Sequence, residues 1–157
     1  MNSKPPEQHD RCAVDIALLV ARIIVGIVFM AHGSQKLFGA FGGQGFSATI
    51  QSMGTLGYFL IAGEFFGGLG LIVGFLSRFS AASLTVIMIG AIVQVHARFG
   101  FFMNWFGKKQ GEGFEYHLLA IALFLVILIA GPGRITILHL LPLPRTGWIG
   151  RFVTIIE

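Results

Sequence analysis

Four long apolar segments constrain this chain more than any other feature of its sequence. They cover residues 14–31, 56–76, 79–96 and 114–130. A helix needs roughly 20 residues to cross the hydrocarbon core of a bilayer, and about 17 are tolerated. Backbone groups inside lipid must be hydrogen-bonded within the protein, so each segment is expected to be a helix. The sequence therefore predicts an all-α fold, an integral membrane bundle of four transmembrane helices.

The composition agrees with a surface that faces lipid. Hydrophobic residues make up 55% of the 157 residues and charged residues only 11%, which is too few charges to cover a soluble domain. The formal net charge is +4, but Lys108 and Lys109 are the only adjacent basic pair. Basic residues that flank membrane helices explain this excess of positive charge better than binding to nucleic acid does. No nucleic-acid partner is therefore expected.

Cysteine content limits the redox chemistry that the chain can carry by itself. Cys12 is the only cysteine, which excludes a disulfide within the chain, a C-x-x-C pair and a cysteine cluster for iron–sulfur or zinc. Any electron chemistry must use a bound cofactor or another subunit.

The segments between the helices divide the chain into three regions. Residues 1–13 are expected to form a soluble N-terminal arm, residues 14–133 the transmembrane domain, and residues 134–157 an amphipathic tail at the membrane surface, because Pro142 and Pro144 interrupt it. Within residues 33–54, Phe46, Ile50 and Met53 have helical spacing, which predicts a short interfacial helix. A tight turn is expected around Ser77 and Arg78, and the aromatic stretch 99–113 is typical of a membrane–water boundary.

The distribution of basic residues predicts the orientation. Six of them, Lys4, Arg11, Arg78, Arg134, Arg145 and Arg151, fall on the side of both termini, against Lys36, Arg98, Lys108 and Lys109 on the other. Basic residues are enriched in cytoplasmic loops, so both termini are expected in the cytoplasm.

Two charged residues lie well inside the apolar segments, where charges are costly. Arg22 is in the first segment and Glu64 in the second, at similar predicted depths. We expect them to form an ion pair, whose purpose is either to fix helix register or to serve function. Gly63, Gly67, Gly70 and Gly74 line one helical face beside Glu64, which indicates close helix packing.

A second group of polar residues gathers near the non-cytoplasmic end of the predicted bundle. It contains His32, Lys36, His96, Glu115 and His117. Such side chains can ligate a metal or haem, or can hydrogen-bond quinone oxygens and relay protons. Each also has an ordinary explanation: histidine is common at membrane interfaces, lysine extends to the headgroups, and a glutamate in a first helical turn is favoured by the helix dipole. No phosphate loop, di-iron motif, dinucleotide fingerprint or Ser-His-Asp arrangement is present.

Several short motifs in order resemble the DoxX family of small bacterial membrane proteins. They are Arg22 with Gly26 and Phe29, the run from His32 to Gly39, the run from Gly63 to Leu69, Gly74 with Arg78, His96 before 100–102, and Glu115 before 131–133. The resemblance implies a four-helix bundle in the bacterial cytoplasmic (inner) membrane. It also implies quinone-linked redox work, since some relatives are subunits of thiosulfate:quinone oxidoreductase and others belong to an oxidative-stress complex with superoxide dismutase and a sulfurtransferase.

These observations lead to one hypothesis and two alternatives. The hypothesis is a membrane subunit of a quinone-linked oxidoreductase that works with soluble redox subunits, with quinone as the expected cofactor. Glu64 and His96 are its candidate catalytic residues, and the candidate cofactor-binding residues are His32, Lys36, His96, Glu115 and His117; no metal site is predicted. The alternatives are a non-catalytic membrane scaffold for soluble partners and a small-solute transporter, which would require a homo-oligomer joined through the glycine face.

Overall fold

The fold consists of helices in the order that the apolar segments predict. The computed structural model describes residues 6–140, and within this range it contains helices and loops but no strand. The helices are α1 (Pro6–Phe38), η1 (Ala40–Gly42), α2 (Gly45–Met53), α3 (Thr55–Val73), α4 (Ser77–Ala91), η2 (Ile92–His96), η3 (Ala97–Phe99), α5 (Glu115–Ala130) and α6 (Ile137–Leu140). The all-α prediction is confirmed.

Three stretches of helix are long and apolar enough to cross a membrane: Asp10–Phe38, Thr55–Val73 and Ser77–Phe99. The fourth, α5, is equally apolar but has 16 residues, which gives it a length of about 24 Å. Large apolar side chains on all four helices face outward, among them Ile24, Phe66, Val86 and Leu119. An outer surface of this kind is solvated by lipid, so the protein is an integral membrane bundle built on four helices.

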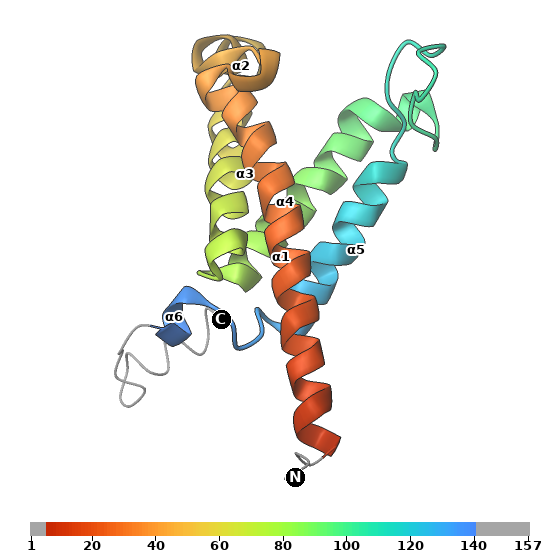
Figure 1. The fold of residues 1–157 in the computed structure, drawn as a ribbon. Coiled ribbons are helices and arrows are strands. Elements are labelled where there is room, and N and C mark those ends of the chain that lie inside the picture. The colour runs from red at the N-terminus through yellow and green to blue at the C-terminus, as the bar shows by residue number, and fades with distance from the viewer. Residues whose placement is uncertain (1–5, 141–157) are drawn as a thin grey trace.

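The four helices form two pairs (Figure 1). Helix α1 packs along α3, α4 packs along α5, and α3 contacts α4. The pairs meet near the turn between α3 and α4, and they diverge toward the end that carries α2 and the loop 100–114. The start of α1 and the short helix α6 lie at the opposite end. The predicted interfacial helix is α2, which includes Phe46, Ile50 and Met53.

Glycines let α1 and α3 approach each other closely. A Cβ atom on Gly68 would lie 2.5 Å from the backbone nitrogen of Met30, and one on Gly33 would collide with the backbone of Phe65. These contacts set the antiparallel register of the two helices. The first three glycines of the face predicted on α3 pack against α4, where a Cβ on Gly63 would meet Ile87, while Gly74 adjoins Arg22 and Thr136. This face is therefore covered within the chain and is not a free surface for a second copy.

Two arginines, Arg22 and Arg78, donate hydrogen bonds to backbone carbonyls at the end of the bundle where α1 starts. Arg22 is fully buried, and its guanidinium donates to the carbonyl oxygens of Leu71 (2.9 Å) and Ile135 (2.6 Å). Arg78 donates to the carbonyl of Leu128 and to that of Ile129. The last carbonyls of a helix have no partner within it, so Arg22 and Arg78 supply donors to the ends of α3 and α5.

Some boundaries differ from those expected. Helix α1 extends beyond the apolar segment 14–31 at both ends, since it runs from Pro6 to Phe38, and part of the predicted arm is therefore helical. The tight turn falls at Gly74–Leu76, where Gly74 and Leu76 have positive φ angles, while Ser77 and Arg78 open α4. Of the predicted tail, α6 is described, whereas Pro142, Pro144 and the rest of 141–157 lie outside the described residues.

Candidate functional site

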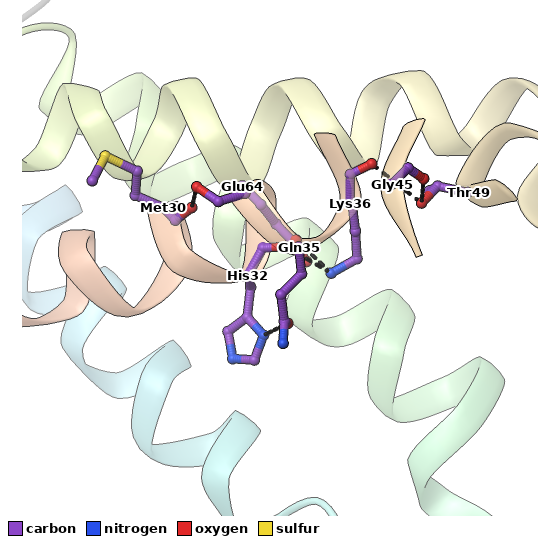
Figure 2. Close-up of polar contacts among 8 residues, drawn as sticks. Met30, His32, Gln35, Lys36, Gly45, Thr49 and Glu64 are labelled. Carbon is purple, nitrogen blue, oxygen red and sulfur yellow. Dashed lines mark hydrogen bonds and ion pairs between the residues drawn. The ribbon is translucent and has the colours of Figure 1, made fainter. Parts of the chain in front are cut away.

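An ion pair joins α1 to α3 and is more buried than the pair between Arg134 and Asp15. Lys36 Nζ lies 2.7 Å from Glu64 Oε2, and the side chains are 25% and 6% exposed. Lys36 Nζ also donates to the carbonyl oxygen of His32, four residues earlier on α1, at 3.4 Å. Figure 2 shows Lys36 directed from α1 toward Glu64 on α3. The pair forms because α1 continues to Phe38, which carries Lys36 to the level of Glu64.

The predicted ion pair between Arg22 and Glu64 was wrong. Arg22 contacts Leu71, which lies seven residues after Glu64 on α3. Seven residues correspond to about 10 Å along a helix, so the two side chains sit at different levels of the bundle. The Arg22 guanidinium is hydrogen-bonded to a carbonyl near the end of α3 and to one in the segment before α6, whereas Glu64 pairs with Lys36.

His32 connects this ion pair to α5. Its Nδ1 lies 3.2 Å from Gln35 Oε1. Its ring centroid is 6.4 Å from that of Tyr116 and 6.2 Å from that of Phe29. His32 therefore stands between the charged pair and an aromatic side chain of the facing helix.

His96 and His117 meet between α4 and α5, as the sequence led us to expect for their positions at one end of the bundle. Their ring centroids are 4.1 Å apart. His96 ends the π-helical turn η2, and turns of this kind, which carry one residue more than an α-turn, are often found at functional sites. His96 Nδ1 lies 2.8 Å from the carbonyl oxygen of Glu112, and His117 is buried at 6% exposure.

Tyr116 also belongs to this group of residues, although the sequence pattern did not predict it. Its ring lies between those of His32 and His117, at 6.4 and 5.5 Å. Tyr116 Oη and His117 Nδ1 are both buried and have no hydrogen-bond partner among the described residues. Its position between Glu115 and His117, two predicted site residues, is the sequence feature that points to it. We call six residues the polar cluster: His32, Lys36, Glu64, His96, Tyr116 and His117.

Glu115 is directed to the loop 100–114. Its Oε1 accepts hydrogen bonds from the backbone nitrogen of Met103 (3.0 Å) and from Trp105 Nε1 (2.9 Å). The carboxylate thus has partners of its own, and no contact joins it to Lys36 or Glu64 among the described residues. Its role here is to hold the loop at the start of α5.

The polar cluster combines an ionised pair, a hydroxyl and three imidazoles along a path from α3 to α4. These groups can donate, accept and hold protons inside an apolar bundle. Within residues 6–140, no group of three or more histidine, cysteine, aspartate or glutamate side chains has a geometry suited to a metal ion. The polar cluster thus places hydrogen-bond donors and acceptors inside an apolar bundle.

The fold and the cluster define a small helical membrane protein with a polar site inside its bundle. Comparison with known proteins then gives the family: the DoxX family model matches residues 17–97. The chain belongs to the DoxX family, as the sequence motifs had indicated.

Two curated relatives extend this match over most of the chain. "Inner membrane protein YqjF" of Escherichia coli is 33% identical over 130 residues, which cover 81% of this chain and 93% of the relative. "Putative oxidoreductase CatD" of Bacillus subtilis is 30% identical over 119 residues, which cover 72% of this chain and 79% of the relative. No solved structure matched the chain.

Proposed function

We propose that this protein is a membrane subunit of a quinone-linked oxidoreductase in the bacterial inner membrane, and that the polar cluster holds the quinone head group. One relative carries an inner-membrane name and another an oxidoreductase name, which supports the location and the class of reaction. The choice of quinone rests on the quinone-linked work that the family resemblance implies, together with the hydrogen-bonding chemistry of the cluster.

The observation that carries this proposal is that Tyr116 Oη and His117 Nδ1, two of the four buried side-chain atoms without partners in the described part of the chain, belong to neighbouring residues of the polar cluster. Each such atom costs about 1–3 kcal/mol when it is left unsatisfied, so a ligand that hydrogen-bonds to both would recover this energy. A quinone head group offers oxygens to hydrogen-bonding side chains, and its flat ring suits the aromatic surroundings of Tyr116, whose ring stacks with that of Phe29. The residues present therefore fit such a ligand.

The proposed roles follow from what each side chain can do. A quinone supplies two-electron chemistry coupled to two protons. Tyr116 Oη can donate a hydrogen bond, and Glu64 and His96 are the candidate catalytic residues that hold or accept protons at Oε2 and Nε2. Lys36 keeps the Glu64 carboxylate in place inside the bundle, and His32 and His117 line the path between Glu64 and His96.

The redox partner that gives electrons to the quinone, or takes them from the hydroquinone, must lie outside this chain, because Cys12 is its only cysteine and no cysteine cluster can form. Soluble redox subunits are the proposed partner. The described start of α1 and the helix α6 lie at one end of the bundle, and the basic residues near the termini favour the cytoplasm for this end. The polar cluster then lies in the half of the bundle toward the other side of the membrane.

Titration of purified protein in mild detergent with a short-chain benzoquinone tests this function. We expect saturable binding with about one site per chain, weakened about tenfold by Tyr116→Phe and by His117→Leu, which each remove one hydrogen bond. Lys108→Gln, a change in the exposed loop, serves as the matched control and should bind as the unaltered protein does. Absence of saturable binding would favour the scaffold alternative.

A further inference from the structure

The contact between His96 and Glu112 determines which ring nitrogen of His96 carries a proton. His96 Nδ1 lies 2.8 Å from the carbonyl oxygen of Glu112. A carbonyl oxygen can only accept a hydrogen bond, so Nδ1 must be the donor. His32 has no such constraint, because its partner is the side-chain amide of Gln35, which can present either an oxygen or a nitrogen.

The Glu112 carbonyl is itself held in place. The Glu112 carboxylate accepts a hydrogen bond from the backbone nitrogen of Asn104 at 2.6 Å, and the backbone nitrogen of Phe114 donates to Gly100 at 3.2 Å. These bonds close the loop around residue 112. The tautomer of His96 is therefore built into the fold and does not depend on a mobile neighbour.

The second ring nitrogen of His96, Nε2, is the one left for a ligand. The ring of His96 lies 4.1 Å from that of His117. The side chains of the two nearby glutamates accept hydrogen bonds from other groups, Glu112 from Asn104 and Glu115 from Met103 and Trp105, so neither occupies Nε2. In a neutral imidazole that donates from Nδ1, Nε2 carries a lone pair. His96 Nε2 makes no hydrogen bond to any residue in the described part of the chain.

We propose that His96 offers its Nε2 lone pair to the ligand as a hydrogen-bond acceptor, so that the site binds the hydroxyl form, a hydroquinone, more tightly than the carbonyl form. This inference rests on the proposed quinone function and specifies which redox form the site selects. A hydroxyl group of the ligand donates to Nε2, whereas a carbonyl oxygen in the same place would face a second acceptor. Tyr116 Oη can both donate and accept, so it accommodates either form, and His96 makes the distinction.

The first test compares the two redox forms of one short-chain benzoquinone at pH 8, where neutral imidazole is favoured. Isothermal titration of the protein in detergent under argon gives one Kd for each form. We expect the hydroquinone to bind about tenfold tighter, the effect of one hydrogen bond exchanged for a repulsive contact. For a two-electron couple, a tenfold preference corresponds to a shift of about 30 mV in the midpoint potential of the bound quinone.

Two variants separate the acceptor role from a packing role. His96→Leu removes the acceptor, and the preference should fall to near unity. His96→Lys replaces the acceptor by a side chain that only donates, and the preference should reverse toward the quinone. Lys108→Gln is the control that keeps the preference of the unaltered protein.

A ¹⁵N NMR spectrum of histidine-labelled protein, assigned through the signal that His96→Leu removes, reads the tautomer without any ligand. We expect a protonated Nδ1 and an unprotonated Nε2. The opposite tautomer, or equal or tighter binding of the quinone form, would overturn the inference and leave the quinone site standing. Failure of both redox forms to bind would overturn the proposed function and this inference with it.

Discussion

Lys36 Nζ and Glu64 Oε2 lie 2.7 Å apart and join α1 to α3 inside the bundle. Arg22, 14 residues before Lys36 on α1, bonds to backbone carbonyls near the other end of the same helix pair. The two intramembrane cations thus serve different ends of the bundle. The ion pair adjoins the polar cluster, and the arginine completes the ends of helices.

The first prediction concerns the ion pair. Lys36→Met leaves the Glu64 carboxylate buried without a cation, and we expect a loss of about 2 kcal/mol in the free energy of unfolding. This value is below that of a fully buried pair because Lys36 is 25% exposed. The double variant Lys36→Met with Glu64→Gln removes the unpaired charge and should recover part of the loss. Unfolding in mixed detergent measures both, and equal stability of the single and double variants would contradict the pairing.

The second prediction tests the separation of Arg22 from Glu64. Arg22→Leu leaves the carbonyls of Leu71 and Ile135 without donors and should lower the free energy of unfolding by about 3 kcal/mol. Because the two side chains do not interact, Arg22→Leu and Glu64→Gln should be additive within about 0.5 kcal/mol. A coupling energy well above this value would show that Arg22 and Glu64 interact directly, as the sequence predicts.

The third prediction concerns the contact between α1 and α3. Gly68→Ala places a Cβ 2.5 Å from the backbone nitrogen of Met30, so the helices must separate, and we expect a loss of at least about 2 kcal/mol in stability. Gly90→Ala is the matched control, since Gly90 is also helical and a Cβ there meets only Gln94 Nε2, at 3.7 Å. The control should be neutral or slightly stabilising. Equal melting temperatures for the two variants would show that α1 and α3 are not in close contact at Gly68.

The fourth prediction concerns the loop 100–114. Glu115→Gln weakens the hydrogen bonds from Met103 and Trp105, because an amide oxygen is a weaker acceptor than a carboxylate. In a Trp148→Phe background, the fluorescence of Trp105 should lose anisotropy and the backbone amides of the loop should exchange faster with deuterium. Quinone affinity should change less than threefold. A large loss of quinone affinity with no change in the loop would show that Glu115 contacts the ligand.

Much of the fold could be predicted because lipid leaves the backbone few choices. The four apolar segments, the interfacial helix and the packing role of the glycine face on α3 all follow from local pattern. The extent of α1 does not, because Lys36 and Phe38 continue the helix through residues that hydropathy assigns to a loop. This difference of two turns moved Lys36 to the level of Glu64.

The site could be predicted only in part, for related reasons. Side chains near one membrane face can be grouped by topology, and His32, His96 and His117 do lie near one end of the bundle. Their partners depend on helix register and on loop conformation, which are set by contacts distant in sequence. Tyr116 is uncharged, so the search for charged residues in apolar segments did not point to it. Glu115 was predicted at the site because its sequence context does not show that the loop 100–114 donates hydrogen bonds to it.

The most direct test of the central claim is mass spectrometry of an organic extract from protein purified gently from its native membrane. We predict a quinone at about one molecule per chain, retained by Lys108→Gln and largely lost from a variant that combines Tyr116→Phe with His117→Leu. A preparation that contains no quinone, and that takes up none when quinone is added, would contradict the account and leave the protein as a membrane scaffold.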